Sequence, residues 1–330
     1  MIASRLFFRL LVLAGGFGFL SVARAAEEPS LDQLFEKGKE LFEQYAPAEI
    51  KEQYEFPSRE QWDGFATRLQ TALESNNVAE LATYETEART ALTALRFFPG
   101  YEDYADWLQE RIDYIEAAKE LEQTTAPVTP PVTPPVTPKQ KSPRSIGPVP
   151  VVKAAETQIP NYNLWLERMR ARPLPSRAGS LMPKLRAAFV AEGLPGELAW
   201  IAEAESTLNP AARSPAGAKG LFQLMPETAK ALGLSVFLPD ERGHVEKSAQ
   251  AAARYLKTLH GKFGDWPLAL AAYNAGEGRV RRLMKASGSD SFAKIAPSLP
   301  SETRMYVPKV CATIAIRAGV APDKLAPPTS

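Results

Sequence analysis

A proline-rich segment near the middle of the chain limits what the chain can fold into. Residues 127–138 read PVTP three times in succession, and further prolines and basic residues continue to Pro150. Proline fixes the backbone angle φ and lacks an N–H, so the segment favours extended polyproline II structure. We expect residues 123–154 to be a semi-rigid linker of about 3.1 Å per residue between two helical parts. The alternative, a ligand for a proline-binding module, suits an exported chain less well.

The first 25 residues have the pattern of a secretory signal. Arg5 and Arg9 precede an apolar stretch from Leu10 to Leu20, and Ala23-Arg24-Ala25 provides the small residues of a cleavage site. An uncleaved membrane anchor is the alternative, but the apolar run is shorter than the roughly 20 residues that a spanning helix needs. We expect cleavage near Ala25, a periplasmic location and no stable transmembrane span in the mature protein.

Charge is divided unequally along the chain. Residues 27–122 hold 23 Asp+Glu and 9 Lys+Arg, a net charge of −14, whereas residues 123–330 hold 15 and 27, a net charge of +12. A basic half can attract a polyanion by long-range electrostatics. Because export argues against nucleic acid, an anionic cell-wall polymer is the better candidate.

Residues 27–122 are expected to form a separate, small helical domain. Apolar residues recur at helical spacing over Leu31–Tyr45, Trp62–Leu73, Val78–Phe98 and Tyr101–Leu121, which predicts three or four helices. The many glutamates are interpreted as a solvated helix face, and the region contains no catalytic constellation. It is expected to act as a spacer or to dock a protein partner.

Residues 155–325 are expected to form a second all-α domain. With one cysteine and two histidines, the chain lacks the residues of a usual zinc site, and no metal or cofactor is expected. Cys311 is interpreted as a buried, inert thiol, and Asp265 as the N-cap of a helix. The predicted helices cover Leu181–Glu192, Gly196–Glu205, Pro226–Gly233, Glu246–Phe263, residues 266–275 and Ser301–Arg317.

Glu205 is the carboxylate that this second domain singles out. It lies where an apolar helix is expected to end, and the uncharged residues Ser206, Thr207 and Leu208 follow it. Desolvation among such groups raises the pKa of a carboxyl toward the value that a general acid needs at neutral pH. Glu203, two positions earlier, would point to a different face of the helix. Composition alone favours the alternative of a helix-end glutamate in a salt bridge.

Three motifs follow one another in the second domain: ESTLNPAARSPAGAKGLFQLMPETA from Glu205, Tyr-Asn-Ala-Gly at Tyr273–Gly276, and SETRMYV around Tyr306. Their residues and order resemble the catalytic signature of lytic transglycosylases of the soluble Slt type, which have a goose-lysozyme-like fold and belong to glycoside hydrolase family 23. The lead-in LPGELAWIAEAES and the ending VPKV lean toward the membrane-bound D type. The resemblance covers about half of the second domain and neither the first domain nor the linker. The first motif matches at Glu205-Ser206, Asn209-Pro210, Ala212, Ser214-Pro215, Gly217-Ala218, Gly220-Leu221-Phe222-Gln223, Met225-Pro226 and Thr228-Ala229.

The resemblance implies a role for each matching side chain. Glu205 corresponds to the single catalytic acid/base. The other implied residues bind substrate: Ser214 and Gln223 orient the sugar and its N-acetyl groups, Met225, Tyr273 and Asn274 line the cleft, and Tyr306 lies close to the catalytic carboxyl. Structural alternatives stay open, because Met225 and Tyr273 could be core residues and Asn274 could be a helix C-cap. Gly217 and Gly220 are better explained by backbone geometry than by contact with substrate.

A single carboxylate suits one kind of sugar chemistry. Ordinary glycosidases use two carboxylates, and the motif region offers no clear second one. The 6-hydroxyl of muramic acid can instead attack its own anomeric carbon at high effective concentration. The resemblance therefore implies cleavage of the MurNAc-GlcNAc β-1,4 bond of peptidoglycan without water, which gives 1,6-anhydro-MurNAc ends.

Two alternatives to this function remain open. One is a lysozyme-like hydrolase of the same bond, and the other is a non-catalytic peptidoglycan-binding scaffold whose acidic domain recruits partners. The cluster Arg279-Arg281-Arg282 could meet the carboxylates of stem peptides, or it could be a solvated helix face.

Overall fold

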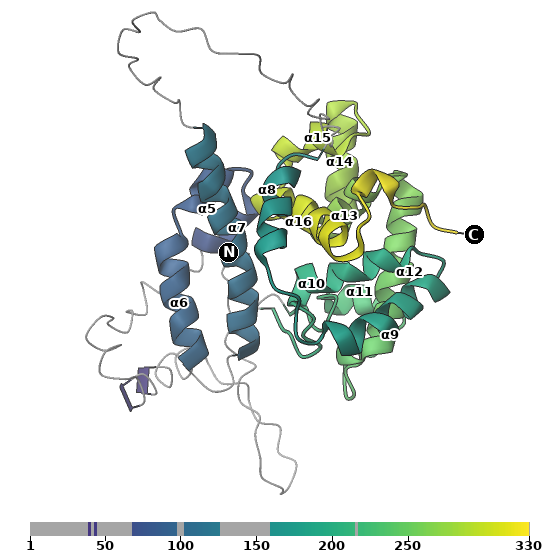
Figure 1. Cartoon of the computed structure of the whole chain (residues 1–330), viewed down its shortest axis with the longest axis horizontal. Coiled ribbons are helices and arrows are strands. Elements are labelled where there is room, and N and C mark those ends of the chain that lie inside the picture. Colours follow the sequence, from purple (N-terminus) through teal and green to yellow (C-terminus); the bar gives the residue numbers. More distant parts are fainter. Residues whose placement is uncertain are drawn as a thin grey trace, which may run out of the picture.

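The fold is helical throughout the part of the chain that the structure describes. The computed structural model describes residues 39–40, 43–44, 68–97, 102–125, 159–214 and 217–329. Within these ranges the regular elements are α-helices and short 3-10 helices (Figure 1), and β-structure is limited to two isolated bridges. The expected all-α class is therefore confirmed for the described residues. The signal segment 1–25, the helices expected before residue 68 and the proline-rich repeats lie outside them.

The first described part is a group of antiparallel helices. It comprises helical residues 68–74, α5 (Val78–Ala82), α6 (Glu85–Phe97) and α7 (Glu102–Thr125). The side chain of Asn77 caps α5 by accepting a hydrogen bond from the Glu80 N–H. The single helix expected over Val78–Phe98 is divided by a turn at Thr83 and Tyr84. Helix α7 runs three residues into the expected linker.

The second described part begins at residue 159 and contains the remaining helices. The predicted helices are present within a few residues of their expected bounds, except that Gly196–Glu205 is a 3-10 turn followed by a short α-helix. α8, α14 and α15 are additional, and Val280 is the one buried residue of α14. The elements are α8 (Tyr162–Ala171), α9 (Ala178–Ala191), η1 (Gly196–Trp200), α10 (Ile201–Ser206), α11 (Pro226–Ala231), η2 (Glu241–Gly243), α12 (Val245–Phe263), α13 (Trp266–Ala275), α14 (Glu277–Ser287), α15 (Phe292–Ile295), η3 (Ala296–Ser298), α16 (Ser301–Ala318) and η4 (Pro322–Lys324).

Helix α16 is the centre of the packing. It contacts α8, α10 and α13 of the second part and α7 of the first (Figure 1). Its sequence is buried almost without interruption from Met305 to Ile314. Cys311 is buried as expected, and desolvation raises the pKa of its thiol. Within the described residues, no helix combines the length and the apolar character needed to cross a lipid bilayer.

The two helical parts meet through buried charges. Lys309 of α16 has no exposed surface, and its Nζ forms ion pairs with Glu110 and Asp113 of α7. Asp113 also pairs with Arg172, which follows α8. Burial alone would raise the pKa of Asp113, but Lys309 and Arg172 overcome this effect and hold it below its usual value. The expectation that the glutamates of 27–122 face solvent is wrong for Glu110, which is buried against Lys309, almost 200 residues later in the chain.

The charge cluster gives a stability prediction. Lys309→Met should lower the free energy of unfolding by about 3–5 kcal/mol, because it leaves two buried carboxylates with Arg172 as their one remaining cation among the described residues. Urea or thermal unfolding of the full chain measures the change. Lys324→Met is a matched control, since Lys324 pairs with Asp323 on the surface and should matter by less than about 1 kcal/mol. Equal effects of the two changes would contradict the importance of the buried cluster.

Candidate active site

Glu205 lies on the last turn of α10, which ends in an unusual backbone reversal. Thr207 and Leu208 follow with φ angles of 50° and 59°, a left-handed conformation that residues other than glycine rarely adopt. The Thr207 N–H donates to the Glu203 carbonyl at 2.9 Å, and the Leu208 N–H donates to the Ala202 carbonyl at 3.2 Å. These bonds close the helix. A β-branched residue in this conformation is strained and persists only where its surroundings hold it.

The carboxyl of Glu205 has a raised pKa. The side chain is half-buried, and desolvation raises its pKa from an ordinary value of 4.5 to about 7. The Tyr306 hydroxyl opposes this rise by donating a hydrogen bond to Oε1 at 2.5 Å, and the positive charge of Arg111 also lowers the pKa. Glu302 acts in the other direction. The result agrees with the expectation for a general acid near neutral pH.

Glu203 is separated from this chemistry by its partner. It has no exposed surface, and Arg317 donates to its two carboxylate oxygens from Nε at 2.9 Å and from Nη2 at 2.7 Å. A buried carboxylate that accepts two hydrogen bonds from one guanidinium forms a structural ion pair with it. The expected difference in direction between Glu203 and Glu205 is therefore present in the structure.

Two tyrosines lie near the Glu205 carboxyl. Tyr306 of α16 is buried, and desolvation together with the charge of Glu205 raises its pKa well above 10, so its hydroxyl remains a proton donor. Desolvation and Glu205 likewise raise the pKa of Tyr273. The Tyr273 hydroxyl donates to the Phe222 carbonyl at 2.7 Å, which connects α13 to the loop after α10. Tyr273 keeps some exposed surface, so it is not purely a core residue.

The loop between α10 and α11 is held by its own hydrogen bonds. Ser214 is buried, and its Oγ accepts from the Ala218 N–H at 3.0 Å. Gln223 has a φ angle of 44°, and its Nε2 donates to the Gly220 carbonyl at 2.9 Å. Both side chains thus stabilise the loop itself, and their contact with a sugar stays a prediction.

Gly220 and Arg242 explain how this loop packs. Gly220 has a φ angle of 81°, and a Cβ atom there would lie 2.0 Å from the Arg242 carbonyl oxygen, so only glycine fits. The sequence pattern did not single out Arg242. Its Nη1 donates to the Gly217 and Leu224 carbonyls at 2.7 and 3.1 Å, and its Nη2 pairs with Asp240 at 2.9 Å. Arg242 therefore ties the middle of the loop to its C-terminal end.

Met225 and Asn274 differ in how far the structure supports their implied roles. Met225 is 38% exposed at the start of α11, so it is not a core residue and can contact a ligand. Asn274 accepts a hydrogen bond at Oδ1 from the Thr303 hydroxyl at 2.7 Å, which ties α13 to α16. The C-cap of α13 is Gly276, so Asn274 is not the cap.

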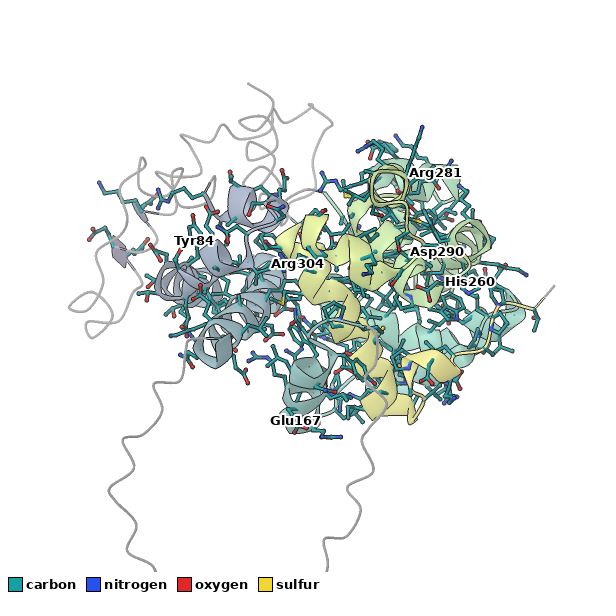
Figure 2. All side chains as sticks on the ribbon, turned by 90° about the horizontal axis from the view of Figure 1, so that it is seen from above. Tyr84, Glu167, His260, Arg281, Asp290 and Arg304 are labelled. Carbon is teal, nitrogen blue, oxygen red and sulfur yellow. The ribbon has the colours of Figure 1, made fainter. Side chains whose placement is uncertain are left out.

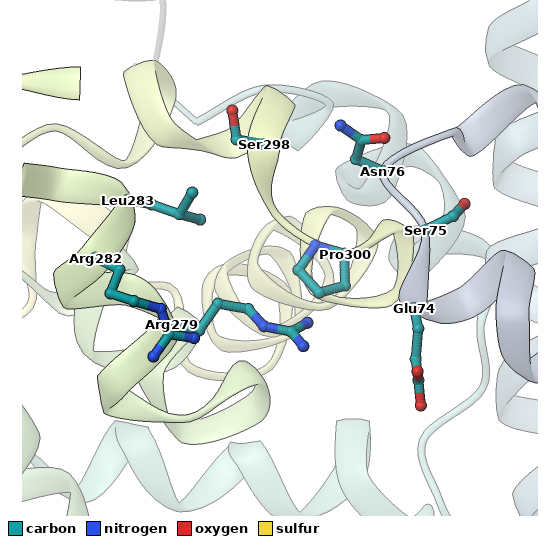
Figure 3. Close-up of a pocket in the computed structure, with 8 residues that line it drawn as sticks. All are labelled: Glu74, Ser75, Asn76, Arg279, Arg282, Leu283, Ser298 and Pro300. Atoms are coloured by element: carbon teal, nitrogen blue, oxygen red, sulfur yellow. The ribbon is translucent and has the colours of Figure 1, made fainter. Parts of the chain in front are cut away.

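A pocket lies where the first helical part meets α14 and the start of α16 (Figure 3). Its volume is about 460 Å³, and Arg279 and Arg282 of α14 extend into it. Neither arginine pairs with a carboxylate among the described residues, whereas Arg281 lies 3.8 Å from Glu277 and at the outer edge of the molecule (Figure 2). The expected arginine cluster is thus divided between the pocket and solvent. The lining residues are Glu74, Ser75, Asn76, Arg279, Arg282, Leu283, Ser298 and Pro300.

Comparison with known proteins identifies the segment that contains Glu205. Residues 186–296 match the family described as the Transglycosylase SLT domain. The chain carries a transglycosylase SLT domain. The resemblance of this segment to lytic transglycosylases, drawn from its motifs, is thereby confirmed.

The relatives of the SLT domain include soluble and membrane-bound proteins. The membrane-bound lytic murein transglycosylase D of Escherichia coli K12 is 40% identical over 124 residues, which are 36% of this chain and 27% of that protein. The soluble lytic murein transglycosylase of Salmonella typhimurium is 41% identical over 120 residues, which are 34% of this chain and 19% of that protein. The chain therefore spans less than a third of the length of these relatives.

A solved structure, the 70 kDa soluble lytic transglycosylase from Escherichia coli, aligns over 90% of this chain and 59% of its own, with 20% identity and a TM-score of 0.39. The SLT domain is identified by the family match over residues 186–296. The surroundings of Glu205 extend beyond that match. Tyr306 and Glu302 follow it on α16, and Arg111 precedes it on α7.

The raised pKa predicts how Glu205 affects stability. Between about pH 4.5 and 7 the folded protein keeps the carboxyl proton that the unfolded chain has lost, so its stability falls as the pH rises through this interval and stays lower above it. Glu205→Gln removes this dependence. The variant should gain on the order of 1–3 kcal/mol over the wild type above pH 7 and little at pH 4, with the partial exposure of the side chain setting the lower bound. Thermal unfolding at several pH values measures the gain, and a gain that did not change with pH would contradict the raised pKa.

Proposed function

We propose that the protein is a peptidoglycan lytic transglycosylase. It cleaves the MurNAc-GlcNAc β-1,4 bond without water and leaves 1,6-anhydro-MurNAc ends, with Glu205 as the single acid/base. The observation that carries the proposal is the Glu205 carboxyl, which has a pKa of about 7 and a 2.5 Å hydrogen bond from Tyr306, inside an SLT domain. The names of its relatives as murein transglycosylases support the substrate.

The first step is protonation of the leaving group. Because its pKa is near neutral, Glu205 is protonated in a large part of the molecules at neutral pH and can give its proton to the glycosidic oxygen. The bond between that oxygen and the anomeric carbon of MurNAc breaks, and GlcNAc leaves as the alcohol. The N-acetyl group of MurNAc can stabilise the positive charge on the sugar. The Tyr306 hydroxyl stabilises the carboxylate that Glu205 becomes.

The second step returns the proton to Glu205. Its carboxylate removes the proton of the MurNAc 6-hydroxyl while that oxygen bonds to the anomeric carbon, so the anhydro ring closes and the carboxyl is regenerated. No second carboxylate is required. Glu203 is paired with Arg317, and Glu302 is paired with Arg111. Neither carboxylate is free to act as a base, which supports the assignment of Glu205 as the single acid/base.

The remaining implied residues complete the proposed cleft. Met225 is exposed at the start of α11 and can form a wall for a sugar ring, and Tyr273 lies near Glu205. Gln223, Ser214 and Asn274 contribute polar groups, each of which already makes internal hydrogen bonds. Their proposed role is to orient the sugar and its N-acetyl groups.

The chain organisation is also part of the proposal. We infer a signal peptide over residues 1–25 that is cleaved near Ala25, an acidic helical domain over residues 27–122, a linker over 123–154 and the catalytic domain over 155–325. The signal pattern supports a periplasmic location, where peptidoglycan is accessible. The acidic domain, apart from the face that α7 turns to α16, stays a candidate surface for a protein partner.

Substitution of Glu205 tests the catalytic assignment. Glu205→Gln should release anhydro-muropeptides from purified sacculi at least about 1,000-fold more slowly than the wild type, because the proton donor and acceptor are both lost. Mass spectrometry of the soluble products measures the rate. Glu167→Gln on the exposed surface of α8 is the matched control and should be unchanged. Wild-type rates for Glu205→Gln would refute the role of Glu205, and binding to sacculi without any product from the wild type would favour the scaffold.

The pocket arginines give a separate prediction about the substrate. Replacing both Arg279 and Arg282 by Gln should raise KM about three- to tenfold for glycan strands that carry stem peptides, because guanidinium groups bind carboxylates. Strands from which the peptides have been removed should show no change. Arg281→Gln is the control, because this exposed side chain is not among the residues that line the pocket. An equal effect on both kinds of strand would mean that the two arginines do not contact the peptides.

A further inference from the structure

Helix α7 of the acidic region reaches the turn that follows Glu205. The Thr207 hydroxyl donates to Oε1 of Glu110 at 2.5 Å, and Nδ2 of Asn209 donates to Oδ2 of Asp106 at 3.2 Å. Both carboxylates belong to α7, about 100 residues before the turn. The SLT match begins at residue 186, so these contacts come from outside it.

The contact with Glu110 fixes a strained position. Thr207 has a φ angle of 50°, which is unfavourable for a β-branched side chain, and its hydroxyl is the group that Glu110 holds. Glu110 is itself 4% exposed and pairs with the buried Lys309, so it is anchored before it binds Thr207. The left-handed turn sets where α10 ends, and Glu205 lies on its last turn.

A second contact of α7 forms an ion pair whose two charges act on Glu205. Nη2 of Arg111 lies 2.7 Å from Oε1 of Glu302, at the start of α16, and its guanidinium lies over the Trp107 ring at 4.8 Å. Its Nε is buried and has no hydrogen-bond partner among the described residues. The ion pair therefore has a fixed position between the two helices.

We propose that α7 is part of the active site, with Glu110 and Arg111 as positioning residues: Glu110 holds the Thr207 turn that aims Glu205, and Arg111 with Glu302 sets the charge beside it. The proposal rests on the proposed function of Glu205. Under it, the acidic region is required for catalysis and is more than a spacer or a docking module.

Arg111 and Glu302 differ from the other polar groups around Glu205 in the charge that they carry. The Tyr114, Tyr273 and Tyr306 hydroxyls, from α7, α13 and α16, all have pKa values raised by burial, so they stay neutral. Lys309 also lowers the pKa of Glu205, but by less than Arg111, and it is paired with Glu110 and Asp113. The charges of Arg111 and Glu302 have the larger effects on the pKa of Glu205 and act in opposite directions, Arg111 lowering it and Glu302 raising it.

The test compares pH–rate profiles of full-length variants. Glu205 must be protonated to start the reaction, so the rate falls as the pH rises through its pKa. Arg111→Met should move this alkaline limb to higher pH and Glu302→Gln to lower pH, each by about half a unit or more, and the double variant should lie near the wild type. A residue that only stabilised the fold would change the rate without opposite shifts. If the alkaline limbs of both single variants coincided with the alkaline limb of the wild type, the role of Arg111 would be overturned.

A second arm tests Glu110 through its partner. Thr207→Val keeps the branched side chain and removes the hydroxyl, so kcat should fall about tenfold or more with little change in KM. Thr207→Ser keeps the hydroxyl and should restore most of kcat. Arg89→Met is the control, because it removes an arginine from an exposed ion pair with Glu85 and Glu116 in the same helical region. An unchanged kcat for Thr207→Val would overturn the role of Glu110.

Two further measurements keep the outcomes distinct. Circular dichroism and thermal unfolding identify any variant that fails to fold, and Glu302→Gln still tests the charge effect if Arg111→Met does not fold. Glu205→Gln is measured in the same series. If it remains active, the proposed function fails. If it is inactive while the Arg111, Glu302 and Thr207 variants match the wild type, the role of α7 alone fails.

Discussion

A lysine on the central helix has no access to water, and much of the structure depends on how its charge is neutralised. Lys309 pairs with Glu110 and Asp113 of α7, and Asp113 also pairs with Arg172 beyond α8. Burying an unpaired charge would cost several kcal/mol, so α16 can be packed at the centre only when α7 lies against it. The acidic region is thus joined to the second helical part by the pairing of buried charges as well as by apolar contact.

The same helices determine the chemistry of Glu205. Burial raises its pKa, and α16 contributes the Tyr306 hydroxyl that limits this rise and can stabilise the carboxylate. The left-handed Thr207 turn, strained in itself, is held by Glu110. Strain and desolvation at the end of α10 both destabilise the fold locally. Catalytic sites commonly combine these features, because a carboxyl whose pKa lies near neutral pH needs a partly desolvated position.

Much of the second domain could be predicted from its sequence, because local signals carry the information. Asp265 caps α13 as expected, its Oδ2 accepting from the Leu268 N–H at 3.1 Å, and α10 ends directly after Glu205. The position of Glu205 beside Tyr306 followed from motifs spaced along the chain. The partners of Glu110 could not be found in this way, since Lys309 and Thr207 are remote in sequence and nothing local distinguishes a buried glutamate on an acidic helix from a solvated one. Arg242 was missed for the same reason: its role depends on carbonyl groups whose positions only the folded loop defines.

The central claim is that Glu205 acts as acid and then as base on a substrate that supplies its own nucleophile. The most direct measurement is digestion of purified sacculi in water enriched in ¹⁸O, followed by mass spectrometry of the released muropeptides. The account predicts 1,6-anhydro-MurNAc ends that contain no ¹⁸O, because the ring oxygen comes from the sugar's own 6-hydroxyl. Reducing MurNAc ends that carry ¹⁸O would contradict it, since they would show that water is the nucleophile.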